Sequence, residues 1–403
     1  MIIAEGMQGP IKISENGRYF VTAAGKPIFW LATTQWQIFR EHPLVEGELI
    51  LDKAKENGFN FIQAMLLGVG DGTKPNIHGD TPWKKDDPAT PNEAYFEHVD
   101  AVVQAARRKE LILVAGIYHQ TMGDRVKMKN ARTWARWIAG RYAGAPNLIW
   151  SMYPKAEPEY TALLRELAIG LQQGDGGVHL ITVHPDPAPA TSSTYLHNES
   201  WLAFNSIQTW ASVDLIYPMV SHDYGLRPAK PVVMAEGAYE NGTEYGFEVS
   251  PLWIRRQAYY SYLAGAHHSY GHNDSWRMLP TWKEALDAPG AKHLSVLKNI
   301  LLSLEEWWNL IPDQAIFASG GCTNGRSLNL AARHRDGKWM IAYFADKASF
   351  KVDLGKVGGK AEAFWIDTRN GESISIGSLT GDTKYFSTPE GWEDSLLVMK
   401  ATK

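Results

Sequence analysis

The feature of this sequence that most constrains its fold is a repeated alternation of short apolar segments with amphipathic ones. The apolar segments are strand-sized, and stretches with helical periodicity stand between most of them. Continuous apolar runs are typical of parallel strands that are buried on both faces, and eight such units favour a closed (β/α)8 TIM barrel over an open sheet. The expected strands are 27–31, 59–65, 111–117, 148–150, 179–183, 204–209, 231–235 and 265–270, and the expected helices are 46–57, 92–109, 130–142, 160–173 and 250–262.

The pattern changes near residue 312. A long amphipathic helix is expected over 291–310, with Pro312 ending it, and short strands separated by turn residues follow. Asp336-Gly337 and Asn370-Gly371 are hairpin signals between these strands. We therefore expect an α/β chain of two domains, a barrel over 1–312 and a C-terminal antiparallel β-sandwich over 313–403.

Composition excludes several classes of partner. The 403 residues include 40 Lys and Arg against 44 Asp and Glu, a net charge of −4, which gives no basic surface for nucleic acid or an anionic membrane. No apolar run is long enough to span a bilayer, and no secretory signal is visible at the start, so a cytoplasmic location is the simplest expectation. A periplasmic or secreted location stays open if a signal was removed. The single cysteine, Cys322, excludes an intrachain disulfide.

Catalytic residues of a barrel enzyme follow the carboxyl ends of the strands. At these positions the chain is rich in Trp, Tyr, His, Gln and Asn, and one carboxylate stands out, Glu236 at the end of the seventh strand. A carboxylate ending a buried strand is costly unless it pairs, for instance with Arg255 or Arg256, or takes part in chemistry. The candidate substrate-binding residues are Trp36, Gln63, His119, His184, Gln208, His268, Tyr270, His272, Asn273 and Trp276.

Neutral hydrogen-bonding groups beside aromatic rings suit an uncharged, polyhydroxylated ligand, and a carboxylate among them suggests attack on an anomeric carbon. A retaining glycosidase uses one carboxylate as nucleophile and a second, roughly 5 Å away, as acid and base. Four of the histidines end strands, but the H-x-H pair that barrel metallohydrolases carry after the first strand is missing, so we expect no metal and no cofactor.

Several motifs resemble one known family. Residues 29–36, FWLATTQW, are similar to its FWLGDTAW, residues 230–236, KPVVMAE, to KPVLNGE, and residues 268–276, HSYGHNDSW, to HTYGHNSIW. Residues 58–63, 92–100 and 282–290 match it as well, so the resemblance covers nearly the whole chain. The family is that of the apiosidase-like glycoside hydrolases, family 140 or DUF4038, whose C-terminal sandwich is often labelled a collagen-binding domain. The resemblance implies a barrel, a retaining carboxylate pair with Glu236 as nucleophile, and a terminal sugar as the group removed.

Two departures from the family pattern concern carboxylates. The family has an Asp after its fourth strand, the expected acid/base, and this chain has Lys155 there; the family's Asp after the first strand is replaced by Thr33. Glu157 is the nearest replacement for the acid, although it also suits a helix N-terminus, where the dipole favours a negative charge. Asp124, Asp186 or no acid at all are the alternatives.

The sequence thus predicts an exo-acting retaining glycoside hydrolase that removes a terminal sugar from a glycan or plant-type glycoside. The alternative is a non-catalytic carbohydrate-binding pseudoenzyme on the same barrel. For the sandwich, a structural cap is favoured over a protein-binding module, because no aromatic stripe marks its surface strands.

Overall fold

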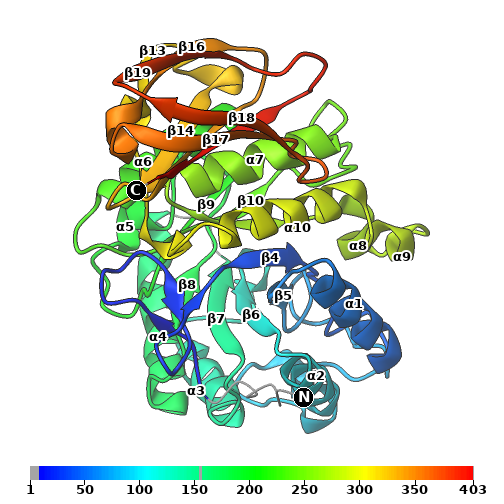
Figure 1. Ribbon diagram of the computed structural model, residues 1–403. Coiled ribbons are helices and arrows are strands. Elements are labelled where there is room, and N and C mark those ends of the chain that lie inside the picture. Colours follow the sequence, from blue (N-terminus) through cyan, green and yellow to red (C-terminus); the bar gives the residue numbers. More distant parts are fainter. Residues whose placement is uncertain (1–8, 154–156, 403) are drawn as a thin grey trace.

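The computed structural model describes residues 9–153 and 157–402 and contains the predicted barrel. Eight parallel strands form one sheet in the order β8-β7-β6-β5-β4-β11-β10-β9, so every strand lies beside its neighbour in sequence. Helices cover the outer face of the sheet, and the sandwich packs on one side of the barrel, outside its layer of helices (Figure 1). The strands are β4 (Leu31–Thr34), β5 (Phe61–Met65), β6 (Ile112–His119), β7 (Leu148–Tyr153), β8 (Ile181–Val183), β9 (Asn205–Trp210), β10 (Val232–Gly237) and β11 (His267–Tyr270).

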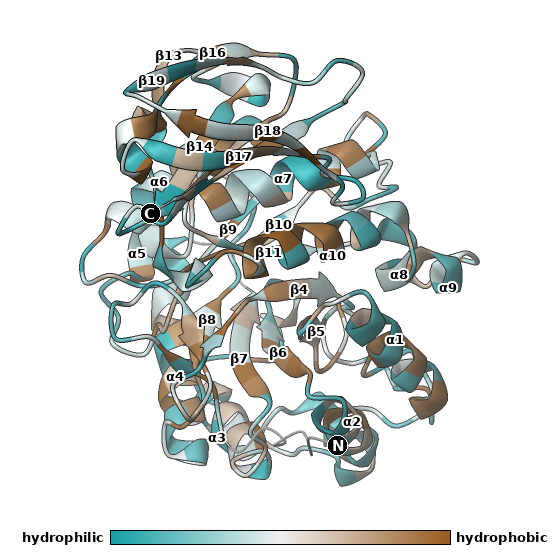
Figure 2. Ribbon diagram, viewed as in Figure 1, coloured by the Kyte–Doolittle hydropathy of each residue, from teal (hydrophilic) through white to brown (hydrophobic). Residues whose placement is uncertain are grey.

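The ring closes between β8 and β9 through backbone contacts just before β9. The amide of Ala203 donates to the carbonyl of Ile181 at 2.8 Å, and Leu202 forms a parallel bridge with Ile181. The outer helices are α1 (Leu44–Glu56), α2 (Glu93–Arg108), α3 (Ala131–Arg141), α4 (Thr161–Asp175), α5 (Ser193–Leu196), α6 (Ile216–Gly225), α7 (Pro251–Leu263), α8 (Asn273–Arg277), α9 (Trp282–Ala285) and α10 (Pro289–Leu302). Hydrophobic and hydrophilic residues mix along α1 and α4, as expected of helices with one face on the sheet (Figure 2).

The first barrel strand differs from the prediction. Pro27–Ile28 forms β3 and pairs with β2 (Phe20–Val21) in a small sheet with β1 (Lys12–Ile13), and the barrel strand begins only at Leu31. The Asn60 side chain separates the two, because it donates to the carbonyl of Phe29 at 2.7 Å and accepts from the amide of Leu31 at 3.0 Å. These bonds occupy backbone groups that a continuous strand would use.

The predicted helix over 291–310 is also shorter in the structure. It ends at Leu302, and Leu310–Pro312 forms β12, an edge strand paired with β14 (Asn329–His334). Proline is tolerated on an edge strand because its missing donor is not needed there. Pro312 therefore belongs to the C-terminal sheet and does not end the helix.

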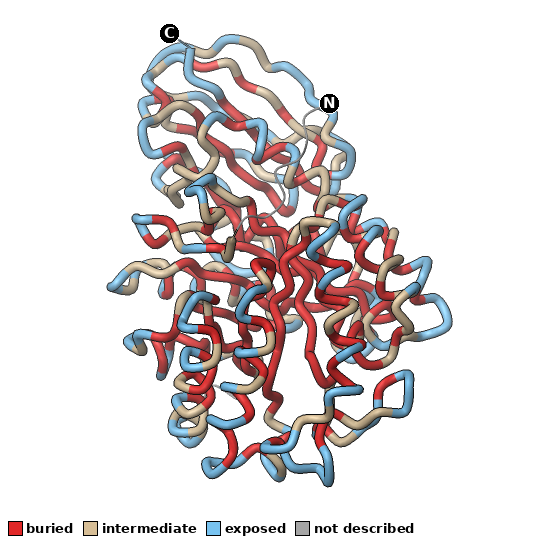
Figure 3. Tube along the Cα trace, turned by 90° about the horizontal axis from the view of Figure 1, so that it is seen from below, coloured by how far each residue is buried: buried red, intermediate tan, exposed pale blue. Residues whose placement is uncertain are grey.

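Aromatic side chains fill the lower part of the barrel. Trp30 stacks on Phe61 with ring centroids 3.9 Å apart, and Phe20 from the N-terminal sheet packs against both and against Phe204. The strands form a buried centre surrounded by exposed loops and helix faces (Figure 3). The aromatic cluster of Phe20, Trp30, Phe61 and Phe204 closes the end of the barrel opposite the carboxyl ends of the strands.

The C-terminal region consists of two antiparallel sheets around their own core, which confirms the predicted sandwich. One sheet has the order β12-β14-β15-β20-β17-β18 and the other β13-β16-β19. Aromatic rings, among them Phe344, Phe350 and Trp365, fill the space between them. The remaining strands are β13 (Phe317–Gly320), β15 (Trp339–Phe344), β16 (Ser349–Asp353), β17 (Lys360–Ile366), β18 (Ser373–Thr380), β19 (Thr383–Ser387) and β20 (Ser395–Ala401).

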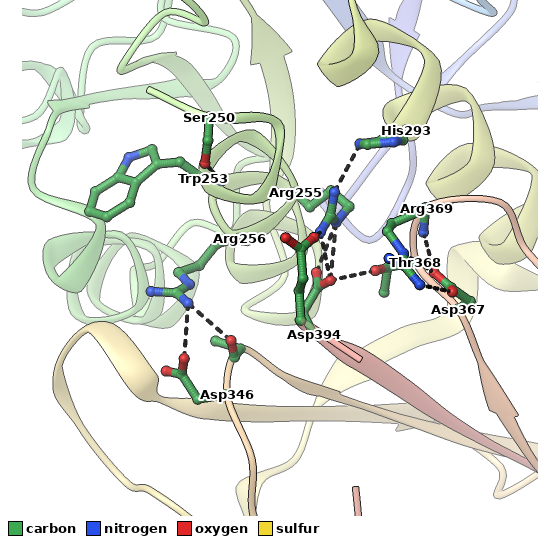
Figure 4. A network of polar contacts seen from close by, with 12 residues as sticks. Ser250, Trp253, Arg255, Arg256, His293, Asp346, Asp367, Thr368, Arg369 and Asp394 are labelled. Carbon is green, nitrogen blue, oxygen red and sulfur yellow. Dashed lines mark hydrogen bonds and ion pairs between the residues drawn. The ribbon is translucent and has the colours of Figure 1, made fainter. Parts of the chain in front are cut away.

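Helix α7 joins the sandwich to the barrel. Arg255 of α7 makes a buried ion pair with Asp394 at 2.8 Å, and Arg256 donates to the carbonyl of Ala345 at 2.9 Å (Figure 4). Tyr259 of α7 stacks on Tyr343 of β15 with centroids 4.5 Å apart. Because α7 follows β10, the sandwich packs on the helix that comes after the strand carrying Glu236.

Candidate active site

Glu236 lies near the carboxyl end of β10, where the ladder with β9 is irregular. The register shifts between Met234 and Glu236, a bulge that re-aims the side chain, and 7% of Glu236 is exposed. Three side chains donate to its carboxylate: Gln208 at 2.7 Å and Trp210 at 3.2 Å to Oε1, and Tyr239 at 2.9 Å to Oε2. The two arginines that could have paired with it, Arg255 and Arg256, contact the sandwich instead.

Burial and hydrogen bonding act on this carboxylate in opposite directions. Desolvation raises the pKa of Glu236 to about 7, and the donors Tyr239, Trp210 and Gln208 lower it, as expected for bonds to the charged form. Perturbed carboxylates of this kind are concentrated at functional sites. The pKa of Glu236 therefore lies close to neutral pH.

Aromatic rings and imidazoles surround the carboxylate. Trp36 donates to the hydroxyl of Tyr239 at 3.0 Å, and its ring lies 6.0 Å from that of Tyr153. The ring of Tyr153 is 4.2 Å from His184 and 5.0 Å from His119. Four of the predicted binding residues, Trp36, His119, His184 and Gln208, thus meet around Glu236.

His184 presents an unpaired nitrogen to the carboxylate. Its Nδ1 lies 3.0 Å from the carbonyl of Pro185, an acceptor, so Nδ1 carries the proton and Nε2 holds a lone pair. Nε2 is buried without a hydrogen-bond partner among the described residues and lies 3.6 Å from Glu236 Oε2. Burial lowers the pKa of His184 and that of His119 to about 4, so both rings are neutral at neutral pH. Two acceptors facing each other suit a ligand hydroxyl that donates between them.

Two glutamines hold the strand ends in place. The amide oxygen of Gln208 accepts from Tyr153 at 3.2 Å while its nitrogen donates to Glu236. Gln63, inside the barrel, donates to the carbonyl of Ala235 at 3.2 Å. Gln63 therefore supports the backbone next to Glu236 from beneath the site.

His268 and Tyr270 do not join this cluster. His268 contacts the hydroxyl of Ser261 on α7, and Tyr270 donates to Glu240 at 2.6 Å and stacks on Phe59. Side chains alternate between the two faces of a strand, and in β11 the residue that packs into the barrel, against Phe20, is His267. His268 and Tyr270 therefore face the surrounding helices.

The other candidates follow the eighth strand, and one of them contacts a partner of Glu236. His272 caps α8 by accepting from the amide of Asp274, and Asn273 lies 3.4 Å from the same residue's carboxylate. Trp276 packs edgewise against Tyr239 with centroids 6.4 Å apart, which connects it to Glu236 through one residue.

Sequence reasoning missed Tyr239 and Tyr245 and left Trp210 out of the binding set. Trp210 has φ +50°, a left-handed conformation that is costly for a bulky residue, and it is 44% exposed while its indole bonds Glu236. Tyr245 packs edgewise on it at 5.8 Å and accepts from the amide of Tyr239 at 3.1 Å. The position of Trp210 after the sixth strand was the available signal.

The candidates for a second carboxylate lie at different places. Lys155 is outside the described residues. Glu157 is exposed, directly before a short 3-10 helix at Pro158–Tyr160, and its side chain forms no cap there. Asp124 is exposed in an outer groove with Asp86, Lys127 and Lys129. Asp186 is half-buried, two residues after His184, and its charge adds to the raised pKa of Glu236.

No group of three His, Cys, Asp or Glu that could hold a metal occurs within 9–153 and 157–402. In the same ranges no helix has the length and apolarity that crossing a membrane requires.

Comparison with known proteins decides the family. Residues 14–309 match the model of the apiosidase-like catalytic domain. The chain belongs to the apiosidase-like family. Residues 311–400 match a model described as a collagen-binding domain of a collagenase. This apiosidase-like protein is therefore a glycoside hydrolase built of a catalytic barrel and a sandwich domain.

Solved structures share the whole architecture. One named as a glycoside hydrolase is 26% identical, with 98% of this chain and 97% of that chain covered and a TM-score of 0.89. A glycoside hydrolase family 5 protein from Bacteroides vulgatus is 24% identical, covering 98% of this chain and 94% of that chain, with a TM-score of 0.89. A β-L-arabinopyranosidase from Geobacillus stearothermophilus shares the fold alone, at 10% identity, a TM-score of 0.55, and 93% and 96% coverage. No curated protein matches the chain.

Proposed function

We propose that this protein is a retaining, exo-acting glycoside hydrolase in which Glu236 attacks the anomeric carbon of a terminal sugar. The observation that carries the proposal is the environment of Glu236, a buried carboxylate held by three neutral donors at the carboxyl end of a barrel strand. Donors that fix a carboxylate without neutralising it leave it nucleophilic, which an ion pair with an arginine would not.

The surroundings favour a neutral sugar. The imidazoles of His119 and His184, which pack against Tyr153, are uncharged at neutral pH. Two arginines that could bind a uronic acid are engaged with carboxylates, Arg125 with Asp86 at 3.8 Å and Arg277 with Glu244 at 3.2 Å. Trp36, Tyr153 and the exposed face of Trp210 offer apolar surfaces for the ring of a sugar or aglycone. The substrate class is therefore a neutral terminal sugar on a glycan or plant-type glycoside.

The sequence predicted Glu157 as the second carboxyl group, and this stays a prediction. Its exposed position after the 154–156 segment supports neither a buried acid nor a direct contact with Glu236. A cytoplasmic location likewise stays a prediction.

The test is turnover of a panel of 4-nitrophenyl glycosides of neutral pentoses and hexoses in both anomers. We expect activity on at least one of them, and we expect Glu236→Gln to abolish it, because one covalent path is lost. Gln208→Ala is a useful companion, since it removes one donor to the carboxylate and should lower the rate less severely. Near-normal turnover by Glu236→Gln would overturn the proposal.

A further inference from the structure

A retaining mechanism needs a second carboxyl group, and a segment next to Glu236 in the structure contains one. Residues 184–188 follow β8; one end of this segment faces Glu236, and the other end is hydrogen-bonded to Gln208, a direct partner of Glu236. At one end, His184 Nε2 lies 3.6 Å from Glu236 Oε2. At the other end, the amide of Ala188 donates to the carbonyl of Gln208 at 2.8 Å, and the Gln208 side chain donates to Glu236.

Asp186 is midway in sequence between His184 and Ala188. A chain spans at most about 3.3–3.6 Å per residue, so the Cα of Asp186 lies within roughly 7 Å of the Cα of His184 and of Ala188. The residue is half-buried, and its charge raises the pKa of both Glu236 and Tyr153, which are joined through Gln208. Its charge thus acts on two residues of the Glu236 cluster, as the nearby contacts of His184 and Ala188 lead one to expect.

We propose that Asp186 is the second carboxyl group of this site and acts as its general acid and base. The proposal rests on Glu236 being the nucleophile. It assigns to the loop after the fifth barrel strand a role for which the sequence favoured Glu157, after the fourth strand. Asp124, the other alternative, is exposed among Lys127 and Lys129 in the outer groove.

The chemistry balances with one water. In the first step a Glu236 oxygen bonds the anomeric carbon, the bond from that carbon to the leaving oxygen breaks, and protonated Asp186 gives its proton to that oxygen. In the second step Asp186 takes a proton from water, the water oxygen bonds the anomeric carbon, and the ester to Glu236 breaks. The sugar leaves with its configuration retained, and the two groups again share one proton.

Two nearby carboxylates are well suited to this cycle. Like charges at short range disfavour double ionisation, so the pair retains one proton into the neutral range. The apparent pKa values of activity then belong to the pair and not to either residue.

The experiment compares Asp186→Ala with Glu157→Ala and Asp124→Ala, using the sugar that gives the highest turnover in the glycoside panel. Each variant is assayed on its 2,4-dinitrophenyl, 4-methoxyphenyl and methyl glycosides, with and without sodium azide, and its thermal unfolding is recorded. We expect Asp186→Ala to lose about 10²–10⁴-fold on the methyl glycoside, the contribution of a positioned acid. On the dinitrophenyl glycoside it should show a burst, because the first step needs no acid, and azide should restore turnover and yield a glycosyl azide of retained configuration.

A purely structural role of Asp186 gives a different result, an equal loss on all three substrates with no response to azide, and this would overturn the assignment. The same holds if Glu157→Ala or Asp124→Ala shows the azide response instead. Glu236→Gln in the same series separates the two proposals. Near-normal activity there overturns the proposed function, whereas its loss beside a fully active Asp186→Ala overturns only the role of Asp186.

Discussion

The joint between the barrel and the sandwich should depend on one buried charge pair. Asp394 accepts from Arg255 at 2.8 and 3.0 Å and from the hydroxyl of Thr368 at 2.7 Å (Figure 4). It also accepts from the hydroxyl of Tyr343 at 2.8 Å. Both members of the pair have side chains only 1% exposed. The perturbation is Asp394→Asn, which keeps the size of the side chain and removes its charge.

The loss of unfolding free energy in Asp394→Asn can be compared with the loss at a second ion pair of the same arginine. Breaking a buried ion pair by neutralising one partner leaves an uncompensated charge and costs about 3–5 kcal/mol. Arg255 also contacts Glu393 at 3.0 Å, but the Glu393 side chain is 54% exposed. An exposed pair contributes about 0–1 kcal/mol, so Glu393→Gln is a matched control on the same arginine.

The assay is urea unfolding followed by circular dichroism on the full chain, with Arg255→Met and the double variant Arg255→Met/Asp394→Asn completing a cycle. We expect the midpoint of Asp394→Asn to fall well below that of Glu393→Gln. The double variant should lose less than the sum of the two single ones, because neither then leaves a charge unpaired. Equal midpoints for Asp394→Asn and Glu393→Gln, or strict additivity, would refute the reasoning.

Further predictions concern helix packing and the site. A Cβ on Gly174 would clash with the carbonyl of Arg136, so Gly174→Ala should destabilise the fold by about 1–2 kcal/mol despite the better helix propensity of alanine. Gly140 lies at the same α3–α4 interface, but a Cβ there would be 3.6 Å from its nearest neighbour, so Gly140→Ala should not destabilise the fold. Thermal unfolding of the two variants measures the difference. Because the folded pKa of Glu236 is raised, to about 7 from 4.5, ionising it costs the folded state roughly 3 kcal/mol as pH rises from 4.5 to 7, so Glu236→Gln should be more stable than the wild type at pH 8 and lose this advantage at pH 4. Because Glu236 and Asp186 share one proton up to about pH 7, kcat/KM on a glycoside with a poor leaving group should fall as pH rises above about 7, where the pair loses that proton and with it the general acid. His184, Tyr153, Tyr239 and Tyr245 also face the carboxylate, and a flat profile from pH 5 to 8 would contradict this. Trp210→Ala should raise KM about tenfold or more, and Trp210→Phe, which keeps a ring but loses the bond to Glu236, should mainly lower kcat; unchanged constants in both would remove Trp210 from the site.

Much of the fold could be predicted because the pattern of apolar residues in the sequence changes near residue 312, where the barrel gives way to the sandwich. Eight buried strands and a later series of hairpins are visible in the apolar pattern, and the structure has both. The start of the first barrel strand could not be predicted, since it depends on the Asn60 side chain from the next strand. Helix α6 was also missed, because its sequence, which includes Pro218, lacks a clear amphipathic stripe.

The site was harder to predict than the fold, because the direction in which each side chain points from its strand decides which residues come into contact. Trp36, His119, His184 and Gln208 lie around Glu236 as their places after the strands suggested. His268 and Tyr270 follow the same rule in sequence, yet the alternation of side chains in β11 turns them toward the helices. Tyr239, by contrast, reaches Glu236 from three residues along the chain, a contact that no spacing rule for strand ends would indicate.

The most direct test of the account is covalent trapping of Glu236. The reagent is the 2,4-dinitrophenyl 2-deoxy-2-fluoro derivative of the best sugar of the panel, because fluorine slows both steps and the good leaving group lets the first one proceed. Intact-mass and peptide mass spectrometry should show one sugar per chain, bound to Glu236 and absent from Glu236→Gln. A sugar bound to another residue, or hydrolysis with inversion and no covalent adduct, would contradict the account.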